Sequence, residues 1–577
     1  MFMRFAIALH LVRFDNSSVG KTYYSLAHNK IRIASKALAT AGRPQCYLLS
    51  TATEVLRNDD DAVFARSMDS LKGKVLSGAI VDMPMSHIPS NMTIHQSTFK
   101  PMEGILQRLH DAMLETRNDN NTLLGSPNVR LQIWNDAALD FLDTNFAQTR
   151  YAHQGLRTLQ LTLDIPDCFM DRLKARGSWS FFDPQYVPLL LDAHSVTFTD
   201  RYTFYESDVT PTMTRPALDV WHSIMKAMFQ TGGPTIVFSD VHKIKSNFNY
   251  FNGRLTNPPS IYSQYDPNPC ALGSLVLTEY AMTAGAFNYN ALRATTADLV
   301  GILTRFFDVH HYSSPEDATR SMSNRMIGIG VSGLAETLIK LNMPFDSYRA
   351  VAVSRQISEV IYFAALEASA AMTKTGHPVS AAYWASPLST GVAQFHLHDD
   401  QPRLFSVDDW QRLLNSFTYT GVANGTLTLQ LSNFPSPPMT LMTDGLPHRT
   451  VQIPHPLLVA ALEEASLWSE EIRSKIISNS GSLQLIQSLP SSIKQRFRTA
   501  FDLPPTAVIH HAVARAPYLT LYQELVLYGR NPLPRDLDSL VLHVKEKDIK
   551  VAITGFNKLI TAHHVVDGVN LDINTAT

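Results

Sequence analysis

Three cysteines offer sulfur chemistry in this 577-residue chain, namely Cys46, Cys168 and Cys270. A thiolate can act as a nucleophile, and two thiols that meet in the fold can exchange electrons by forming a disulfide. A cysteine can equally be a small buried hydrophobic side chain, and that alternative stays open for all three. So few cysteines in so long a chain indicate an intracellular, reducing compartment rather than secretion.

Phosphate binding is the second chemistry that residue spacing suggests. Residues 328–333, GIGVSG, have the glycine spacing of loops that let a phosphate approach the backbone closely. That pattern is weak evidence alone, because it has meaning only where a strand precedes it and a helix follows. The acidic run at 58–61, NDDD, is interpreted as a solvated turn.

The composition excludes several classes of protein. Hydrophobic residues make up 45% of the chain and charged residues 17%, which is typical of a folded globular protein. A formal net charge of -2 gives no basic excess, so we expect no nucleic-acid partner. No apolar run is long enough for a membrane helix, so we expect no membrane association. Nothing in the sequence calls for a cofactor or a metal ion.

The elements that must position these side chains alternate between helix and strand. Alternating apolar residues predict strands at 5–11 and 157–165, and the first of these argues against a signal peptide. Helical periodicity predicts helices at 20–40, 216–231, 349–373 and 457–478. The alternation predicts an α/β fold with much parallel sheet.

Several blocks, taken in order, resemble the large subunit of class I ribonucleotide reductase. They are GRPQCYLLS at 42–50, LDFLD at 139–143, LDIPDCFM at 163–170, SWSFFDPQYVP within 178–205, KSN at 245–247, CALGSLVL at 270–277, RMIGIGVSGLAETL at 325–338 and IISNSGSLQLI at 476–486. The resemblance covers roughly residues 20–560. It implies a ten-stranded α/β barrel built from two five-stranded halves, with a finger loop that enters its centre.

This resemblance divides the chain into three parts. Residues 1–40 would be a remnant of an N-terminal strand and helix, 41–560 the reductase-like barrel, and 561–577 a tail without cysteines. Only 45 residues precede Cys46, so we expect no activity-controlling ATP cone.

The resemblance also assigns roles to individual residues. Cys46 and Cys270 match the pair of cysteines that donates electrons to the substrate. Asn257 matches an amide that binds the sugar, and Asn424 an amide beside the active site, although Asn424 could equally be a turn residue next to Gly425. The phosphate-binding segment matches the positions of Pro435 and Ser436, followed by two further prolines, which lack N–H donors.

Other positions lack the chemistry that the family uses. Pro259 stands where the family has its radical-bearing cysteine, and Ile261 where it has a catalytic carboxylate. Thr554 and Gly555 stand where two tyrosines relay the radical. Proline has no thiol, isoleucine carries no acidic proton, and neither threonine nor glycine has a phenol to oxidise. These replacements predict a chain that does not catalyse the reductase reaction.

The resulting interpretation is a catalytically inactive homologue of the large subunit, of the betaherpesvirus type, which acts by binding host or viral proteins in the virion tegument and the host cytoplasm. A homodimer is compatible with this interpretation, whereas the small reductase subunit is not expected as a partner. Two alternatives stay open: an active ribonucleoside-diphosphate reductase large subunit, and a nucleotide-binding regulator without turnover. Residues 451–454, VQIP, resemble an interaction motif of some relatives but are interpreted as a coincidence.

Overall fold

The computed structural model describes most of the chain. The described ranges are 1–10, 16–33, 37–38, 49, 51–53, 61–76, 78–88, 101–116, 125–143, 158–191, 193–246, 269–282, 285–312, 315–431, 441–446 and 449–559.

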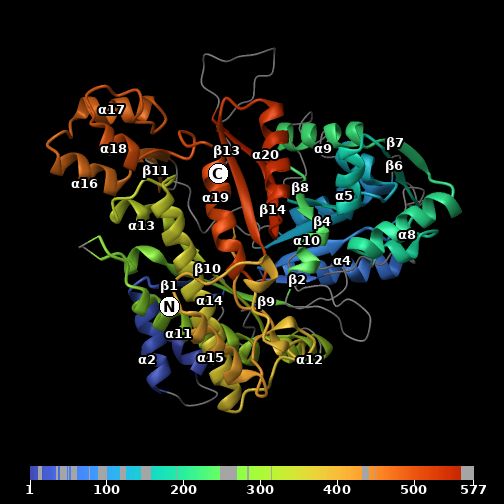
Figure 1. Ribbon diagram of the computed structural model, residues 1–577, viewed down its shortest axis with the longest axis horizontal. Coiled ribbons are helices and arrows are strands. Elements are labelled where there is room, and N and C mark those ends of the chain that lie inside the picture. Colours follow the sequence, from blue (N-terminus) through green and yellow to red (C-terminus); the bar gives the residue numbers. More distant parts are fainter. Residues whose placement is uncertain are drawn as a thin grey trace.

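The larger sheet contains strands from the first half of the chain and two strands from the C-terminal end of the chain (Figure 1). Five parallel neighbours make up its first part: β2 (Thr51–Thr53), β3 (Ile80–Pro84), β4 (Ser126–Gln132), β5 (Gln160–Ile165) and β8 (Thr235–Phe238). Strand β14 (Val551–Leu559) pairs antiparallel with β8 and parallel with β13 (Gln523–Arg530).

A second sheet supplies three more strands. Strand β9 (Cys270–Val276) lies between β10 (Met326–Ser332), which is parallel to it, and β1 (Ile31–Ile33), which is antiparallel. Residues 428–430 connect the two sheets, because Thr428 bridges to Ile329 on β10 and Gln430 bridges to Gln523 on β13. Within the described ranges no ladder joins β2 to β9, so the two sheets form an incomplete ring.

Two large hydrophobic cores cover the outside of this ring, one for each half. The first core packs the strands β3 to β8 against α4 (Asp61–Leu76), α5 (Pro101–Leu114), α7 (Asp167–Lys174), α8 (Ser195–Asp208), α9 (Ala217–Thr231) and α20 (Pro534–Glu546). The second packs β9 and β10 against α1 (Phe2–His10), α2 (Asn16–Ala27), α11 (Tyr289–Val309), α13 (Leu334–Lys340), α14 (Tyr348–Lys374) and α15 (Val407–Phe417). Helix α19 (Thr506–Arg515) contributes residues to both cores.

Smaller elements lie at the periphery. Helices α16 (Pro456–Glu464), α17 (Glu470–Ser478) and α18 (Ser491–Arg496) share a separate hydrophobic cluster and project from the rest (Figure 1). The remaining elements are the strand pairs β6 (Ser178–Phe181) with β7 (Met213–Pro216) and β11 (Leu441–Leu446) with β12 (Arg449–Pro454), and the helices α10 (Ser239–Ile244), α12 (Pro315–Asn324), η2 (Pro188–Leu190), η3 (Leu277–Tyr280), η4 (Pro387–Thr390), η5 (His396–His398) and η6 (Ala516–Tyr518).

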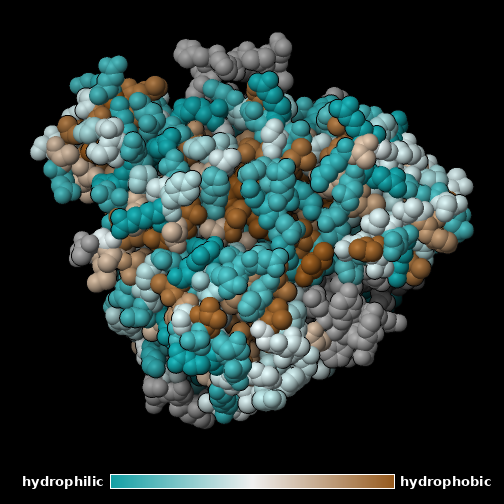
Figure 2. Space-filling view, viewed as in Figure 1, coloured by the Kyte–Doolittle hydropathy of each residue, from teal (hydrophilic) through white to brown (hydrophobic). Residues whose placement is uncertain are grey.

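The face in Figure 2 carries mostly hydrophilic side chains with scattered apolar ones. In the described part of the chain, no helix has both the length and the apolar character needed to cross a membrane.

Three of the predicted elements are confirmed. The strand predicted at 157–165 is β5, and the helix predicted at 349–373 is α14. The helix predicted at 216–231 is α9, with Pro216 before its first turn and Gly232 in the left-handed conformation after its last. In each case the sequence carried both a clear period and its own boundary signals.

The predicted strand at 5–11 is wrong, because residues 2–10 form α1. Phe5, Ala6 and Leu9 are buried, and the two large side chains, Phe5 and Leu9, lie four residues apart on one face of a helix. The strand prediction counted Ile7 as a buried apolar position, but its side chain is exposed.

Two predicted helices are shorter than expected. The region 20–40 contains α2, which ends at Ala27, and then β1 at 31–33, with Asn29 at positive φ between them. The region 457–478 is two helices, α16 and α17, separated by a turn in which Ser466 has φ 56°. A residue in the left-handed conformation cannot continue an α-helix.

Candidate functional site

The inner face of the large sheet is polar on three neighbouring strands. On β3, β4 and β5 the apolar residues Val81, Val129 and Leu163 pack into the outer core. Side chains alternate between the two faces of a strand, so the residues between them point away from the outer helices into the ring. These inward positions hold Asp82 on β3, Asn128, Arg130 and Gln132 on β4, and Thr162 and Asp164 on β5, and all six are buried.

Hydrogen bonds link these inward side chains across the strands. The Asn128 amide donates to Asp82 Oδ1 at 2.9 Å, and the Thr162 hydroxyl donates to Asn128 Oδ1 at 2.8 Å. Arg130 Nε donates to Asp164 Oδ2 at 2.6 Å, which forms a buried ion pair. One cation and two carboxyl groups therefore share the interior of the ring.

Burial controls the ionisation of this cluster. Burial raises the pKa of Asp82 well above its usual value, against the opposing effects of Arg130 and of the Asn128 hydrogen bond. Burial also raises the pKa of Asp164, again against the nearby Arg130 charge. Buried carboxyl groups whose pKa values are raised are often found at functional sites.

Cys270 faces the same interior. Its side chain packs in one small cluster with Val237 of β8, Leu429 and Ala552 of β14, apart from both outer cores. Val237 is the register partner of Asp164 on the neighbouring strand, so Asp164 lies on the same face. The thiol is buried, and burial raises its pKa, so it stays protonated in the absence of a ligand.

Basic groups lie at this end of the ring as well. Strand β14 starts where β8 ends, since the two are antiparallel, and Lys550 and His242 lie at that junction. Lys550 Nζ donates to the Thr520 carbonyl at 2.7 Å, and burial lowers the pKa of Lys550 well below its usual value, with the charge of Lys245 adding to the effect. The ring Nε2–H of His242 donates to the Val551 carbonyl at 3.1 Å, and burial lowers the pKa of His242 to about 3.

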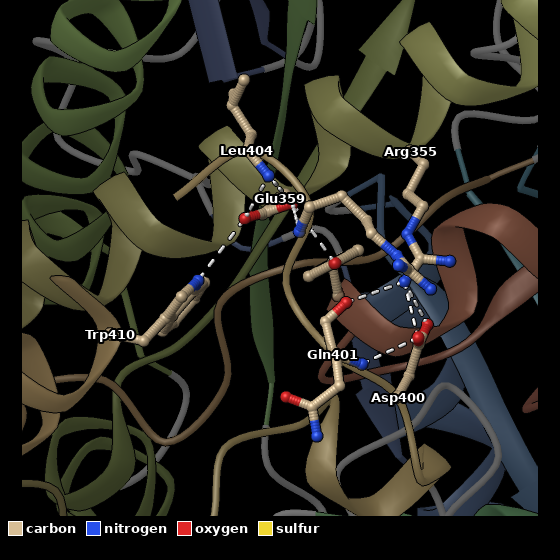
Figure 3. Close-up of polar contacts among 8 residues, drawn as sticks. Arg355, Glu359, Asp400, Gln401, Leu404 and Trp410 are labelled. Atoms are coloured by element: carbon tan, nitrogen blue, oxygen red, sulfur yellow. Dashed lines mark hydrogen bonds and ion pairs between the residues drawn. The ribbon is translucent and has the colours of Figure 1, made fainter. Parts of the chain in front are cut away.

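Glu359 on α14 is a buried carboxylate whose two oxygens both accept hydrogen bonds (Figure 3). It accepts hydrogen bonds from three consecutive backbone N–H groups, those of residues 403–405, at 2.8 to 3.1 Å. The Trp410 indole at 3.5 Å and the Tyr518 hydroxyl at 3.3 Å also donate to it. Beside it Arg355 holds Asp400 with two contacts of 2.6 Å. These bonds fix the loop before α15 and leave Glu359 no free acceptor for chemistry.

Asn424, predicted to be an amide beside the active site, is buried and occupied by protein contacts. Its amide donates to Thr304 Oγ1 and to the Arg325 carbonyl, both at 2.9 Å, and its carbonyl accepts from the Ser369 hydroxyl at 2.8 Å. In this structure the side chain joins α11, α14 and the start of β10.

Thr554 and Gly555 lie on β14, where the register with β13 shifts by one residue. Gly555 is packed so closely against the end of α9 that a Cβ atom there would lie 2.4 Å from the Met228 carbonyl oxygen. No larger side chain fits at position 555 with this backbone. The Thr554 hydroxyl donates to the Leu525 carbonyl at 3.4 Å.

The glycine-rich run has a packing explanation. It covers the end of β10 and the entry to α13, with Gly333 at φ 75° between them. A Cβ on Gly328 would lie 1.8 Å from Leu429 Cδ2, and one on Gly330 would lie 3.2 Å from the Leu429 carbonyl oxygen. These glycines therefore let residues 427–430 lie against β10.

Six predicted site residues lie outside the described residues: Cys46, Asn257, Pro259, Ile261, Pro435 and Ser436. The family resemblance implies that Cys46 lies near Cys270 and that residues 258–259 of the finger loop enter the barrel, and both stay predictions. In the described part of the chain, no three His, Cys, Asp or Glu side chains are grouped so that they could hold a metal ion.

Sequence reasoning missed Asp82, Arg130 and Asp164. Their signal was present, because polar and apolar residues alternate along β3, β4 and β5. An alternating strand predicts one polar face but does not say whether that face meets solvent or the interior of a ring.

The two half-rings, with helices outside and a buried cysteine inside, form an incomplete α/β barrel. A family model described as "Ribonucleotide reductase, barrel domain" matches residues 87–431 and 442–554. The chain belongs to this family.

Named relatives cover nearly the whole chain. The "Ribonucleoside-diphosphate reductase large chain" of Neurospora crassa is 28% identical over 94% of this chain, which spans 60% of that relative's length. The large subunit of Danio rerio is 26% identical over 96% of this chain and 71% of its own length. The large subunit of Variola virus is 28% identical over 94% of this chain and 72% of its own length.

These comparisons overturn the expectation of an inactive homologue that acts by protein binding. The relatives that match over almost the whole chain carry the name of a reductase large subunit or large chain. The replacements at 257–261, on which much of that expectation depended, lie outside the described residues, and a loss of catalysis is not shown. The alternative of a ribonucleoside-diphosphate reductase large subunit agrees better with the matches.

Proposed function

We propose that this chain is the large subunit of a ribonucleoside-diphosphate reductase and binds a ribonucleoside diphosphate inside its barrel. The family match and the names of the relatives support this proposal. The observation that carries it in the structure is Cys270, a buried thiol that shares an inner cluster with Val237, and Val237 is the register partner of Asp164 in the Arg130–Asp164 ion pair.

The chemistry of reduction needs sulfur that can supply electrons to the sugar. Residues 248–269 contain no cysteine, so the proposal places this chemistry on the barrel strand that carries Cys270, with Cys46 as its partner thiol. Lys550, whose ammonium form is destabilised by burial, would regain its charge beside a bound phosphate. The basic end of the ring therefore suits the diphosphate.

Formation of deoxynucleotide from labelled cytidine diphosphate tests the proposal. The purified chain is assayed with an external dithiol, with and without a radical-supplying small subunit, beside an active large subunit as a positive control. We expect turnover above the small-subunit background, and we expect Cys270→Ser to abolish it. Cys168→Ser is the matched control, because Cys168 lies on α7 and packs in the outer core. Background turnover in the wild type, with an active positive control, would contradict the proposal.

The same proposal includes the closure of the barrel, the branch of the family and the oligomeric state. We infer that β2 and β9 close the ring into a ten-stranded barrel, which the contacts between these two strands support. The motif resemblance favours the herpesvirus branch of the family. A homodimer and a protein partner also stay predictions, and light scattering of the purified chain measures the first.

A further inference from the structure

A cavity of about 650 Å³ lies on the outside of the second core. Its lining comes from Arg293 on α11, from one face of α14, from Phe405 and from one face of α15. The residues that α14 contributes run from Phe363 to Lys374, roughly 16 Å along the helix at about 1.5 Å per residue. A volume and a length of this size suit a small elongated ligand.

One wall of the cavity is aromatic and held in place. The rings of Phe363 and Phe405 stack with their centroids 4.1 Å apart and their planes 15° apart. The backbone N–H of Phe405 donates to Glu359 at 2.9 Å, which fixes this residue against α14. The rest of the apolar lining is formed by Ala370, Ala371 and Leu413. Because alanine leaves room beside the helix, this surface suits an aromatic ligand that lies along α14.

The two carboxylates of the cavity are already bound by donors of the protein. Arg293 donates to both oxygens of Glu367 at 2.7 to 3.1 Å. Asp409 pairs with Arg412 through one oxygen, and its other oxygen accepts from the N–H and the hydroxyl of Ser406. The charges of these two ion pairs cancel, so neither acid strongly attracts a cationic ligand.

Lys374 is the cation that these two ion pairs leave over. It is exposed in the last turn of α14, and within the described residues no hydrogen bond or ion pair holds its ammonium group. The cavity therefore carries one net positive charge, from three cations and two carboxylates. One carboxylate on a ligand would neutralise that charge, whereas further negative charges would face Glu367 and Asp409 without a matching cation.

We propose that this cavity binds an elongated aromatic monocarboxylate, with its rings along α14 toward Phe363 and Phe405 and its carboxylate at Lys374. The ammonium group would give the carboxylate a charge-assisted hydrogen bond, while the aromatic body supplies most of the contact area. The lining elements α11, α14 and α15 lie outside the ring, so the site is independent of the proposed reaction.

Equilibrium dialysis of the full chain against 4-biphenylcarboxylate and against its neutral amide, 4-biphenylcarboxamide, tests the site. We expect the wild type to bind the carboxylate roughly tenfold more tightly than the amide, as for a hydrogen bond to a charged group. Lys374→Gln should remove this preference, because glutamine keeps a polar side chain without the charge. Lys174→Gln is the matched control and should keep the preference, because Lys174 is also exposed in the last turn of a helix, α7, but does not line the cavity.

Ala371→Trp is the second variant, because position 371 is exposed and a large side chain there would fill the cavity without changing its charge. It should weaken the binding of both ligands roughly tenfold or more, since their rings lose contact area. Unfolding midpoints measured without ligand show whether each variant is folded. Equal binding of the two ligands to the wild type, or an unchanged preference in folded Lys374→Gln, would overturn the proposal. Unchanged carboxylate binding in folded Ala371→Trp would place the ligand elsewhere and overturn it too, as would a wild type that binds neither ligand.

Discussion

Glu359 and the pair Asp82 and Asp164 are all buried acids, yet their surroundings give them opposite roles. Glu359 accepts from three backbone N–H groups and two side chains, so its bonds hold a loop in place. Asp82 and Asp164 each keep one oxygen without a partner in the described structure. At the scale of single residues, the number of satisfied lone pairs therefore separates a structural acid from a candidate binding group.

Replacing Glu359 by glutamine should destabilise the protein strongly. The amide replaces one accepting oxygen by a donor that faces backbone N–H groups, so at least one buried donor loses its partner. We expect a loss of about 3 kcal/mol in the free energy of unfolding, measured by denaturant titration. Glu367→Gln is the matched control, because Glu367 on the same helix is 47% exposed in its pair with Arg293 and should cost less than about 1 kcal/mol. Equal losses in the two variants would contradict this reading of Glu359.

Gly328→Ala should also destabilise, because its Cβ would lie 1.8 Å from Leu429 Cδ2 and 2.8 Å from Leu272 Cδ2. We expect a cost of roughly 1–3 kcal/mol from overpacking, measured as a lower unfolding midpoint. Gly301→Ala within α11 is the control, since a Cβ there meets nothing within 4 Å and should stabilise by roughly 0.5–1 kcal/mol. A neutral Gly328→Ala would show that residues 427–430 do not lie close against β10.

At the scale of elements, the sequence predicted those segments whose period and boundaries agree. Helix α9 has a clear apolar stripe between Pro216 and Gly232, and it was predicted to within a residue. Helix α1 was missed because its apolar residues fit both periods, and packing against α2 and α11 selects the helix. The inner acids could not be predicted from local pattern, because β3 to β5 bury their polar face only when the ring forms.

The acids on β3 and β5 should cost stability at neutral pH. Burial raises the folded-state pKa of Asp82, so the folded protein keeps a proton that the unfolded chain releases above about pH 4. Stability from this group is therefore present at low pH and is lost as the pH rises toward the folded pKa. Asp82→Asn removes this loss, so we expect it to match the wild type near pH 4 and to exceed it at pH 7. Denaturant midpoints across that range measure the difference, and a constant deficit of the variant would contradict the expectation.

At the scale of the whole molecule, the ring brings together groups from opposite ends of the chain. One hydrophobic cluster contains Val237, Cys270 and Ala552, which belong to three segments far apart in the sequence. A ligand bound inside would therefore contact both halves, each of which has its own outer core. A ligand that binds only the native state stabilises that state, and the stabilisation grows with the ligand concentration.

Cytidine diphosphate should consequently protect strands of both halves from hydrogen exchange at the same time. We expect slower exchange of the backbone amides of β4 and β5 in the first half and of β9 and β10 in the second, in proportion to occupancy. The surface cavity of about 650 Å³ is lined by Lys374 and by two ion pairs, Arg293 with Glu367 and Arg412 with Asp409. Protection confined to α11, α14 and α15 around that cavity would show that the nucleotide binds outside the ring, and would contradict a site that joins its two halves.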